Sequence, residues 1–173
     1  MNTVIGVGNV LLSDDGIGVH AVRALQALWG ERSDTTFIDA GTLSYELLDW
    51  VSGSEYTLII DAAYMQSLPG TVAVFYDEDI ESQFSAAPSR TVHQISLRDT
   101  LKTSKIMFGR PKQCALIGVE PEFLSWGASP SKVVKLSLPK IIDSAYHILS
   151  RWGIPITKPE NLSEFLMEDS NDP

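Results

Sequence analysis

Residues 3–30 read TVIGVGNVLLSDDGIGVHAVRALQALWG, and this stretch decides the fold class. Its first part, Thr3–Gly8, is a short β-branched run that ends in glycines, which predicts a buried strand. From Gly18 to Trp29 the apolar residues recur at helical spacing, and Gly30 suits the position just after a helix. The stretch therefore predicts a strand, a loop that carries two acids, and a helix.

The same alternation continues along the chain. Further strands are expected at Thr35–Asp39, Tyr56–Asp61, Thr71–Tyr76 and Gln113–Val119. Helical stripes run over Leu43–Val51, from about His93 to Ser104, and over Val134–Trp152. Pro139 lies inside the last stripe and predicts a kink or a fresh helix start. Alternating strands and helices predict an α/β fold: a three-layer sandwich with a mostly parallel twisted sheet and helices on both faces.

Composition limits the classes of function. The chain has 173 residues, which fits one domain, and its net charge of −9 argues against binding nucleic acid or an anionic membrane through a broad positive face. The single cysteine, Cys114, excludes an internal disulfide and a cysteine-based zinc site. It lies within a predicted strand with no basic neighbour, so we expect a buried core residue and not a nucleophile.

The two ends of the chain carry separate signals. The first apolar stretch lacks a basic flank and is broken by glycines, which is typical of neither a secretory signal nor a membrane span. A cytoplasmic protein is therefore expected, and we expect it to be a monomer. Residues 160–172 hold five acids and no base. We expect a single α/β domain at 1–152 and a dispensable acidic surface tail at 153–173.

Acidic residues follow three successive predicted strands. Asp14 and Asp15 come after the first strand, Asp39 ends the second, and Asp61 ends the third. Ligands of open α/β sheets bind outside the carboxyl ends of the strands, so a shared site is favoured over three unrelated caps. Spacing alone does not choose between Asp14 and Asp15.

Among the three histidines, His93 is the candidate functional residue. It lies where an irregular polar stretch meets a predicted helix, whereas His20 and His147 lie off the apolar stripes of helices and are expected at the surface. Asp15, Asp61 and His93 together would suit a divalent metal such as zinc, nickel or cadmium, or a metal-free acid/base reaction.

The first turn also bears a partial likeness to a dinucleotide-binding loop. Gly6 and Gly8 are present, but the third glycine of that fingerprint is missing, and two acids lie where a pyrophosphate would bind. A nucleotide-handling enzyme therefore stays a weak alternative.

Five blocks in order resemble the nickel–iron hydrogenase maturation endopeptidases. They are GVGNVLLSDDGIGVHAVRAL, DAGTLSYELLDWV, LIIDAAYMQSLPGTV, VHQISLRDTLK and ALIGVEPEFLSWG, within residues 3–152. The first block is the most specific, because its pattern is long and its spacing is fixed. The tail after Trp152 matches nothing in that family.

The resemblance implies a function and a set of residues. Members remove a C-terminal extension from the precursor of the hydrogenase large subunit after nickel insertion. Asp15, Asp61 and His93 would contact the metal, and Asp39 is a further acid of the cleft. The nickel belongs to the substrate, and an aspartic-type, metal-assisted hydrolysis with Asp39 or Asp61 as general base is implied. The alternative is a chaperone or metal-sensing module that binds the nickel-loaded subunit without cutting it.

Overall fold

The computed structural model describes residues 1–42, 46–80, 82, 92–109 and 111–158, with the backbone alone at 92–96 and 98. Its centre is a five-stranded sheet in the order β2-β1-β3-β5-β4. The strands are β1 (Asn2–Val7), β2 (Thr35–Gly41), β3 (Tyr56–Ala62), β4 (Val72–Tyr76) and β5 (Gln113–Val119). The first four in spatial order are parallel, and β4 pairs antiparallel with β5. The predicted mostly parallel sheet is confirmed.

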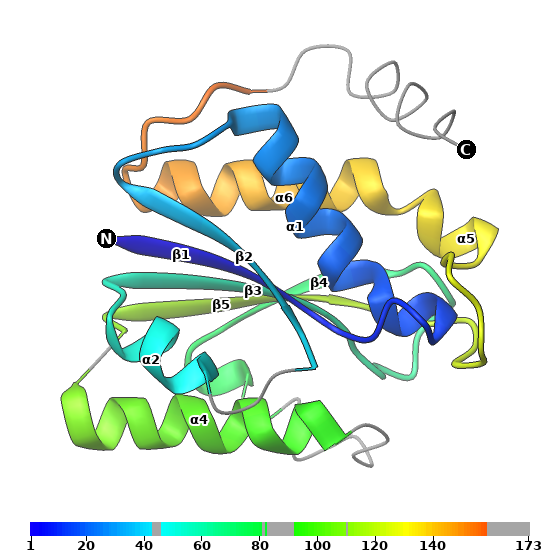
Figure 1. Ribbon diagram of the computed structural model, residues 1–173, viewed down its shortest axis with the longest axis horizontal. Coiled ribbons are helices and arrows are strands. Elements are labelled where there is room, and N and C mark those ends of the chain that lie inside the picture. Colours follow the sequence, from blue (N-terminus) through cyan, green and yellow to red (C-terminus); the bar gives the residue numbers. More distant parts are fainter. Residues whose placement is uncertain (43–45, 81, 83–91, 110, 159–173) are drawn as a thin grey trace.

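Helices cover both faces of this sheet, as Figure 1 shows. Helices α1 (Ile17–Trp29) and α6 (Leu138–Arg151) lie on one face, and α2 (Glu46–Ser52) and α4 (Val92–Phe108) on the other. Each face has its own apolar core, because side chains of a strand alternate between the two faces: Leu58 and Ile60 pack toward α1 and α6, and Ile59 packs toward α2. The three-layer α/β sandwich is therefore confirmed.

Pro139 marks a fresh start and not a kink within one helix. A short helix, α5 (Lys132–Lys135), ends before α6 begins, and the proline lies in the first turn of α6. Proline is tolerated there because the first backbone N–H groups of a helix have no partner within the helix. None of the described helices combines the length and the apolarity that crossing a bilayer requires.

Two glycines let α1 lie directly on the strand ends. A Cβ atom on Gly18 would lie 2.2 Å from the carbonyl oxygen of Ile60 and 2.3 Å from that of Val7. Gly8 has a φ of +134°, and a Cβ there would lie 1.8 Å from the carbonyl oxygen of Asp15. Gly18 therefore has a structural role, because no side chain fits between α1 and the ends of β1 and β3.

Cys114 and the start of the acidic tail are both part of the packed domain. Cys114 is buried among apolar residues, and burial, with a smaller contribution from the Asp77 carboxylate, raises the pKa of its thiol.

Ile154 belongs to the core beside α6, and the indole Nε1 of Trp29 donates to the carbonyl oxygen of Thr157 at 3.0 Å. A cut at Gly153 would therefore remove core contacts, because the domain packing extends beyond residue 152. The remainder of the expected tail, 159–173, lies outside the described residues.

Candidate active site

A 3₁₀ turn after β1 places two adjacent acids in different roles. This turn, η1 (Ser13–Gly16), buries Asp14 and Asp15. Asp14 accepts backbone N–H groups from Glu122 at 2.8 Å, Phe123 at 3.1 Å and Ser131 at 2.5 Å. It also accepts the Ser131 hydroxyl at 3.1 Å. Asp14 therefore fastens the chain after β5 to the turn after β1.

Asp14 does not cap the helix that follows this turn. Gly16 itself is the residue before α1, and no side chain caps that helix. Sequence could not reveal the difference, because the groups that Asp14 binds are more than 100 residues away along the chain.

Asp15 and Asp61 are two further buried acids at this edge. One oxygen of Asp15 accepts the backbone N–H of Asn9 at 2.9 Å, which closes the loop after β1. Asp61 is fully buried near the carboxyl end of β3, opposite Gly118 of β5. The turn η1 contacts β3, so the structure brings both predicted acids to the same end of the sheet.

Asp39 lies at the same end but on the other face. Along β2 the side chains alternate, with Phe37 on the α1 face and Ile38 on the α2 face, so Asp39 returns to the α1 face. There its Oδ2 accepts from Arg23 Nε at 3.0 Å and from Arg23 Nη2 at 2.7 Å. Its Oδ1 accepts the backbone N–H of Gly41 at 3.1 Å. Asp39 is thus an ion-paired residue of the rim.

Asp61 and the start of α4 share the opposite face. The alternation that puts Ile59 in the α2 core puts Asp61 on that face too. His93 is the second residue of α4, and in Figure 1 this helix begins at the right, the end where β1, β3 and β5 run out. The side chain of His93 lies outside the described part of the structure.

The metal ligand set therefore stays a prediction. Among the described residues, no group of three His, Cys, Asp or Glu side chains is arranged to hold a metal ion. The donor types remain suited to nickel, since two carboxylates and one imidazole leave coordination positions for a substrate.

Glu120 is a buried acid that sequence reasoning missed. Its Oε2 accepts the backbone N–H groups of Met65 at 2.6 Å and Ser67 at 3.2 Å. The loop after β3 is thereby held against the end of β5, in the same way that Asp14 holds the loop after β5. The sequence could have pointed to Glu120, because this acid directly follows a predicted buried strand.

His20 is less exposed than its position off the apolar stripe suggested. It is half-buried on α1, and its Nε2 is buried without a hydrogen-bond partner in the described part of the structure. Burial, followed by the nearby charges of Arg23 and Lys135, lowers the pKa of His20, while Asp39 opposes the shift.

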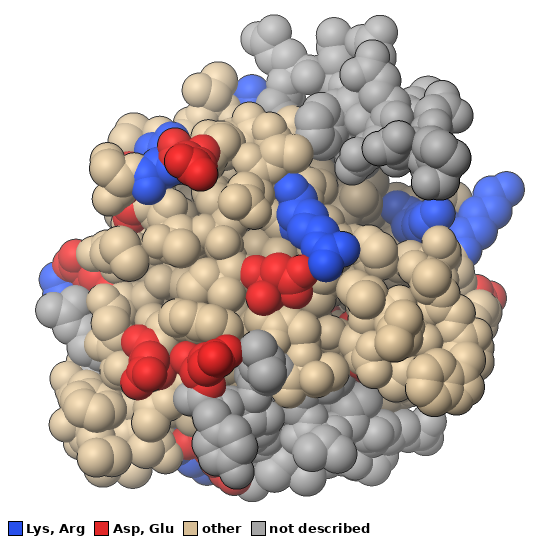
Figure 2. Space-filling view, in the orientation of Figure 1, with Lys and Arg blue, Asp and Glu red and all other residues tan. Residues whose placement is uncertain are grey.

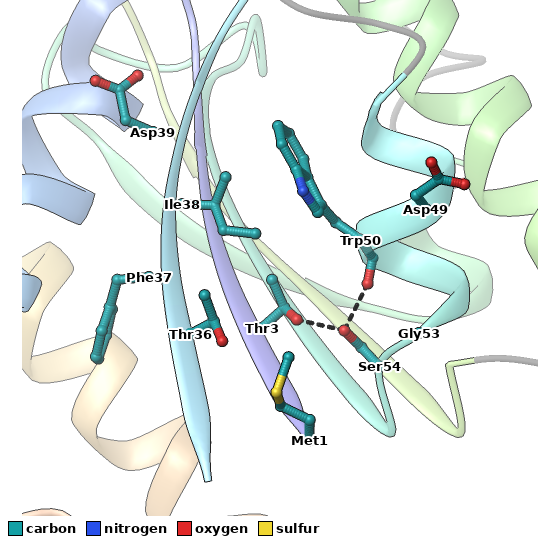
Figure 3. Close-up of a pocket in the computed structure, with 10 residues that line it drawn as sticks. All are labelled: Met1, Thr3, Thr36, Phe37, Ile38, Asp39, Asp49, Trp50, Gly53 and Ser54. Atoms are coloured by element: carbon teal, nitrogen blue, oxygen red, sulfur yellow. Dashed lines mark hydrogen bonds between the residues drawn. The ribbon is translucent and has the colours of Figure 1, made fainter. Parts of the chain in front are cut away.

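A cavity of about 540 Å³ lies at the free edge of the sheet, between β2 and α2. Figure 3 shows Ile38 and Trp50 facing each other there, with Asp39 on the far side of β2. The hydroxyl of Ser54 donates to the carbonyl oxygen of Trp50 at 2.6 Å and shares a hydrogen bond with Thr3. Asp15 and Asp61 do not line this cavity, so it is separate from the buried acids.

Known proteins resemble this chain over most of its length. A family model described as hydrogenase maturation protease matches residues 19–148. The hydrogenase expression/formation protein HupD of Rhizobium leguminosarum bv. viciae is 30% identical over 159 residues, which cover 91% of this chain and 78% of that protein. For the hydrogenase 2 maturation protease of Escherichia coli K12 the identity is 30% over 152 residues, with 87% and 92% covered.

The fold agrees with these sequence matches. The solved structure of the hydrogenase maturating endopeptidase HybD from E. coli superposes with a TM-score of 0.81 at 30% identity, covering 88% of this chain and 93% of that one. Both the sequence and the arrangement of its strands and helices thus place the chain in the hydrogenase maturation protease family.

Proposed function

We propose that this protein is the endopeptidase that removes the C-terminal extension of a nickel–iron hydrogenase large-subunit precursor once nickel has been inserted. The observation that carries the proposal is the pair of buried acids, Asp15 and Asp61, at the carboxyl edge of the sheet. Both lie within sequence blocks that resemble the maturation endopeptidases. The names of the relatives, a maturation protease and a maturating endopeptidase, support peptide-bond cleavage over binding alone.

In the proposed reaction the nickel arrives with the substrate. Asp15, Asp61 and His93 would contact it and thereby align the peptide bond that follows the metal-binding segment. Such a metal polarises a carbonyl group or lowers the pKa of a water molecule. Water adds to the carbonyl carbon, the C–N bond breaks, and the proton that the base removes from water reaches the leaving amine.

We assign the role of general base to Asp61 and not to Asp39. Both oxygens of Asp39 already accept hydrogen bonds, two of them from Arg23, and these bonds hold the carboxylate at the rim on the α1 face. Asp61 instead lies on the face where α4 begins, the face on which His93 is expected to act. Asp39 then has a positioning role at the rim, through Arg23 and α1.

The direct test is the intact mass of the nickel-loaded precursor before and after incubation with the protein. A loss equal to the extension supports the peptidase, whereas a stable complex of unchanged mass would establish the non-cutting chaperone. The nickel-free precursor should stay uncut. Asp15→Ala, Asp61→Ala and His93→Ala should each abolish processing while the fold is kept, and Asp15→Glu should be milder than Asp15→Ala.

Pairs of these substitutions should be no worse than single ones, because one lost ligand already disrupts a shared metal contact. The matched control is Asp143→Ala on α6, an acid whose charge partners are His147 and Lys158 and which lies outside the site. Near-normal processing by Asp61→Ala would overturn the assignment of the base.

A further inference from the structure

Large apolar side chains are exposed on the segments that follow β1, β3 and β5. Trp126 is 81% exposed and Leu136 is 70% exposed, although side chains of this kind usually lie in the core. We call the whole set the apolar face: Leu11, Leu68, Phe123, Trp126, Val133 and Leu136. Exposed apolar residues gathered in one place mark interaction sites more often than single ones do.

Hydrogen bonds tie the first half of the apolar face to the turn that carries Asp15. Gly127 donates its backbone N–H to the carbonyl oxygen of Leu11 at 3.0 Å, and its own carbonyl oxygen accepts from Ser13 at 2.8 Å. The Ser13 hydroxyl donates to the carbonyl oxygen of Ser125 at 2.9 Å. Trp126 is therefore held between two residues that are both anchored on η1.

The second half of the apolar face is tied to the same turn through α5. Ser131, the residue before α5, is bound to Asp14 through both its N–H and its hydroxyl. The loop after β3 also reaches α5, since a Cβ on Gly70 would lie 2.8 Å from the carbonyl oxygen of Val133. The three segments thus form one fixed surface beside Asp15, and not separate flexible loops.

The charge of this surface differs from that of the whole chain. The chain carries −9, yet the exposed residues of α5 and the residue after it are two lysines, Lys132 and Lys135, and two apolar residues, Val133 and Leu136. In Figure 2 the right-hand end, where α5 lies in Figure 1, is mostly uncharged, with Lys and Arg side chains above the uncharged area and an acidic side chain at its right edge. An apolar surface with acidic neighbours would complement it.

We propose that the apolar face is the docking surface for the folded body of the large-subunit precursor, with Trp126 as its anchor. The inference rests on the proposed function and adds to it the surface that recognises the substrate protein. The precursor would present an apolar patch with acidic neighbours near its C-terminal segment, so that docking brings the scissile bond to Asp15 and Asp61. Tryptophan residues at the centre of interfaces often carry much of the binding energy.

The chain offers a matched control at the other end of the molecule. Ile106, near the end of α4, is 84% exposed, and Figure 1 shows that end of α4 at the opposite end of the sheet from α5. The test compares Trp126→Ser and Leu136→Ser with Ile106→Ser in processing of the nickel-loaded precursor. Because all three side chains are exposed, the melting temperatures of the three variants should match that of the wild-type protein.

We expect the KM for the precursor to rise at least about tenfold in Trp126→Ser, with a smaller rise in Leu136→Ser and none in Ile106→Ser. The value of kcat at saturating precursor should stay unchanged, because the reacting groups are intact. Binding of each variant to the immobilised precursor is measured in parallel and should weaken by the same factor.

The outcomes separate this inference from the proposed function. If the wild-type protein cuts the precursor and the KM of Trp126→Ser is unchanged, the docking surface is wrong while the function stands. If the wild-type protein does not cut the precursor, the proposed function is wrong. The binding measurements then decide by themselves whether the apolar face is the docking surface. If Trp126→Ser changes only a monomer–dimer equilibrium seen by sedimentation, the surface joins two copies of this chain and the inference is overturned.

Discussion

The buried acids at the carboxyl end of the sheet and the exposed acids at its amino end have opposite roles. At the carboxyl end, Asp14 and Glu120 are buried and accept backbone N–H groups from neighbouring loops. At the amino end, Asp34 pairs with Arg32 and Glu55 pairs with Lys112 near the surface. A buried acid bonded to N–H groups fixes loops because its loss leaves those donors unsatisfied, whereas an exposed ion pair contributes little.

The largest effect is expected where α1 meets the strand ends. Gly18→Val should lower the free energy of unfolding by about 4 kcal/mol or more, because the new side chain overlaps the carbonyl groups of Ile60 and Val7. Urea unfolding followed by circular dichroism measures this. Gly53→Ala is the control, since the nearest atom there is 3.2 Å away, and equal losses in both variants would contradict the close packing.

Removing the carboxylate of Asp14 should have the next largest effect. Asp14→Ala deprives three backbone N–H groups and one hydroxyl of their acceptor and should cost about 3 kcal/mol. Asp14→Asn retains one acceptor oxygen and should cost less. Hydrogen exchange at Glu122 and Ser131 should speed up in Asp14→Ala. A loss of only about 1 kcal/mol, typical of a helix cap, would show that these bonds matter little.

A smaller effect should appear in the pH dependence of stability. The pKa of His20 is lowered in the folded protein, chiefly by burial, so the unfolded chain binds a proton more readily. His20 therefore destabilises the fold as pH falls through about 6.5, the ordinary value, toward the lowered one. His20→Gln should show a smaller drop in melting temperature than the wild-type protein between pH 7.5 and 5.5, and identical drops would refute the shift.

The smallest effect is expected from the exposed pair at the amino end. Lys112→Ala should change the free energy of unfolding by about 0.5 kcal/mol or less, because water screens its pairing with Glu55. Thermal melts at low and high salt test this, and both should give nearly the same small difference. A loss as large as that of Asp14→Ala would remove the contrast between the two ends.

Local sequence determined the elements of this protein. The β-branched runs, the helical stripes and Pro139 each act over a few residues, so the strands, the helices and the fresh start of α6 could be predicted from neighbouring residues alone. The blocks around Asp15 and Asp61 predicted the family.

Only the tertiary structure decided what each acid does. Asp14 and Asp15 are adjacent and chemically identical, yet one binds segments that follow β5 and the other closes its own loop at Asn9. Asp39 and Asp61 both end strands, yet strand alternation turns them to opposite faces of the sheet. These roles depend on partners distant in the chain, which only folding brings into hydrogen-bonding range.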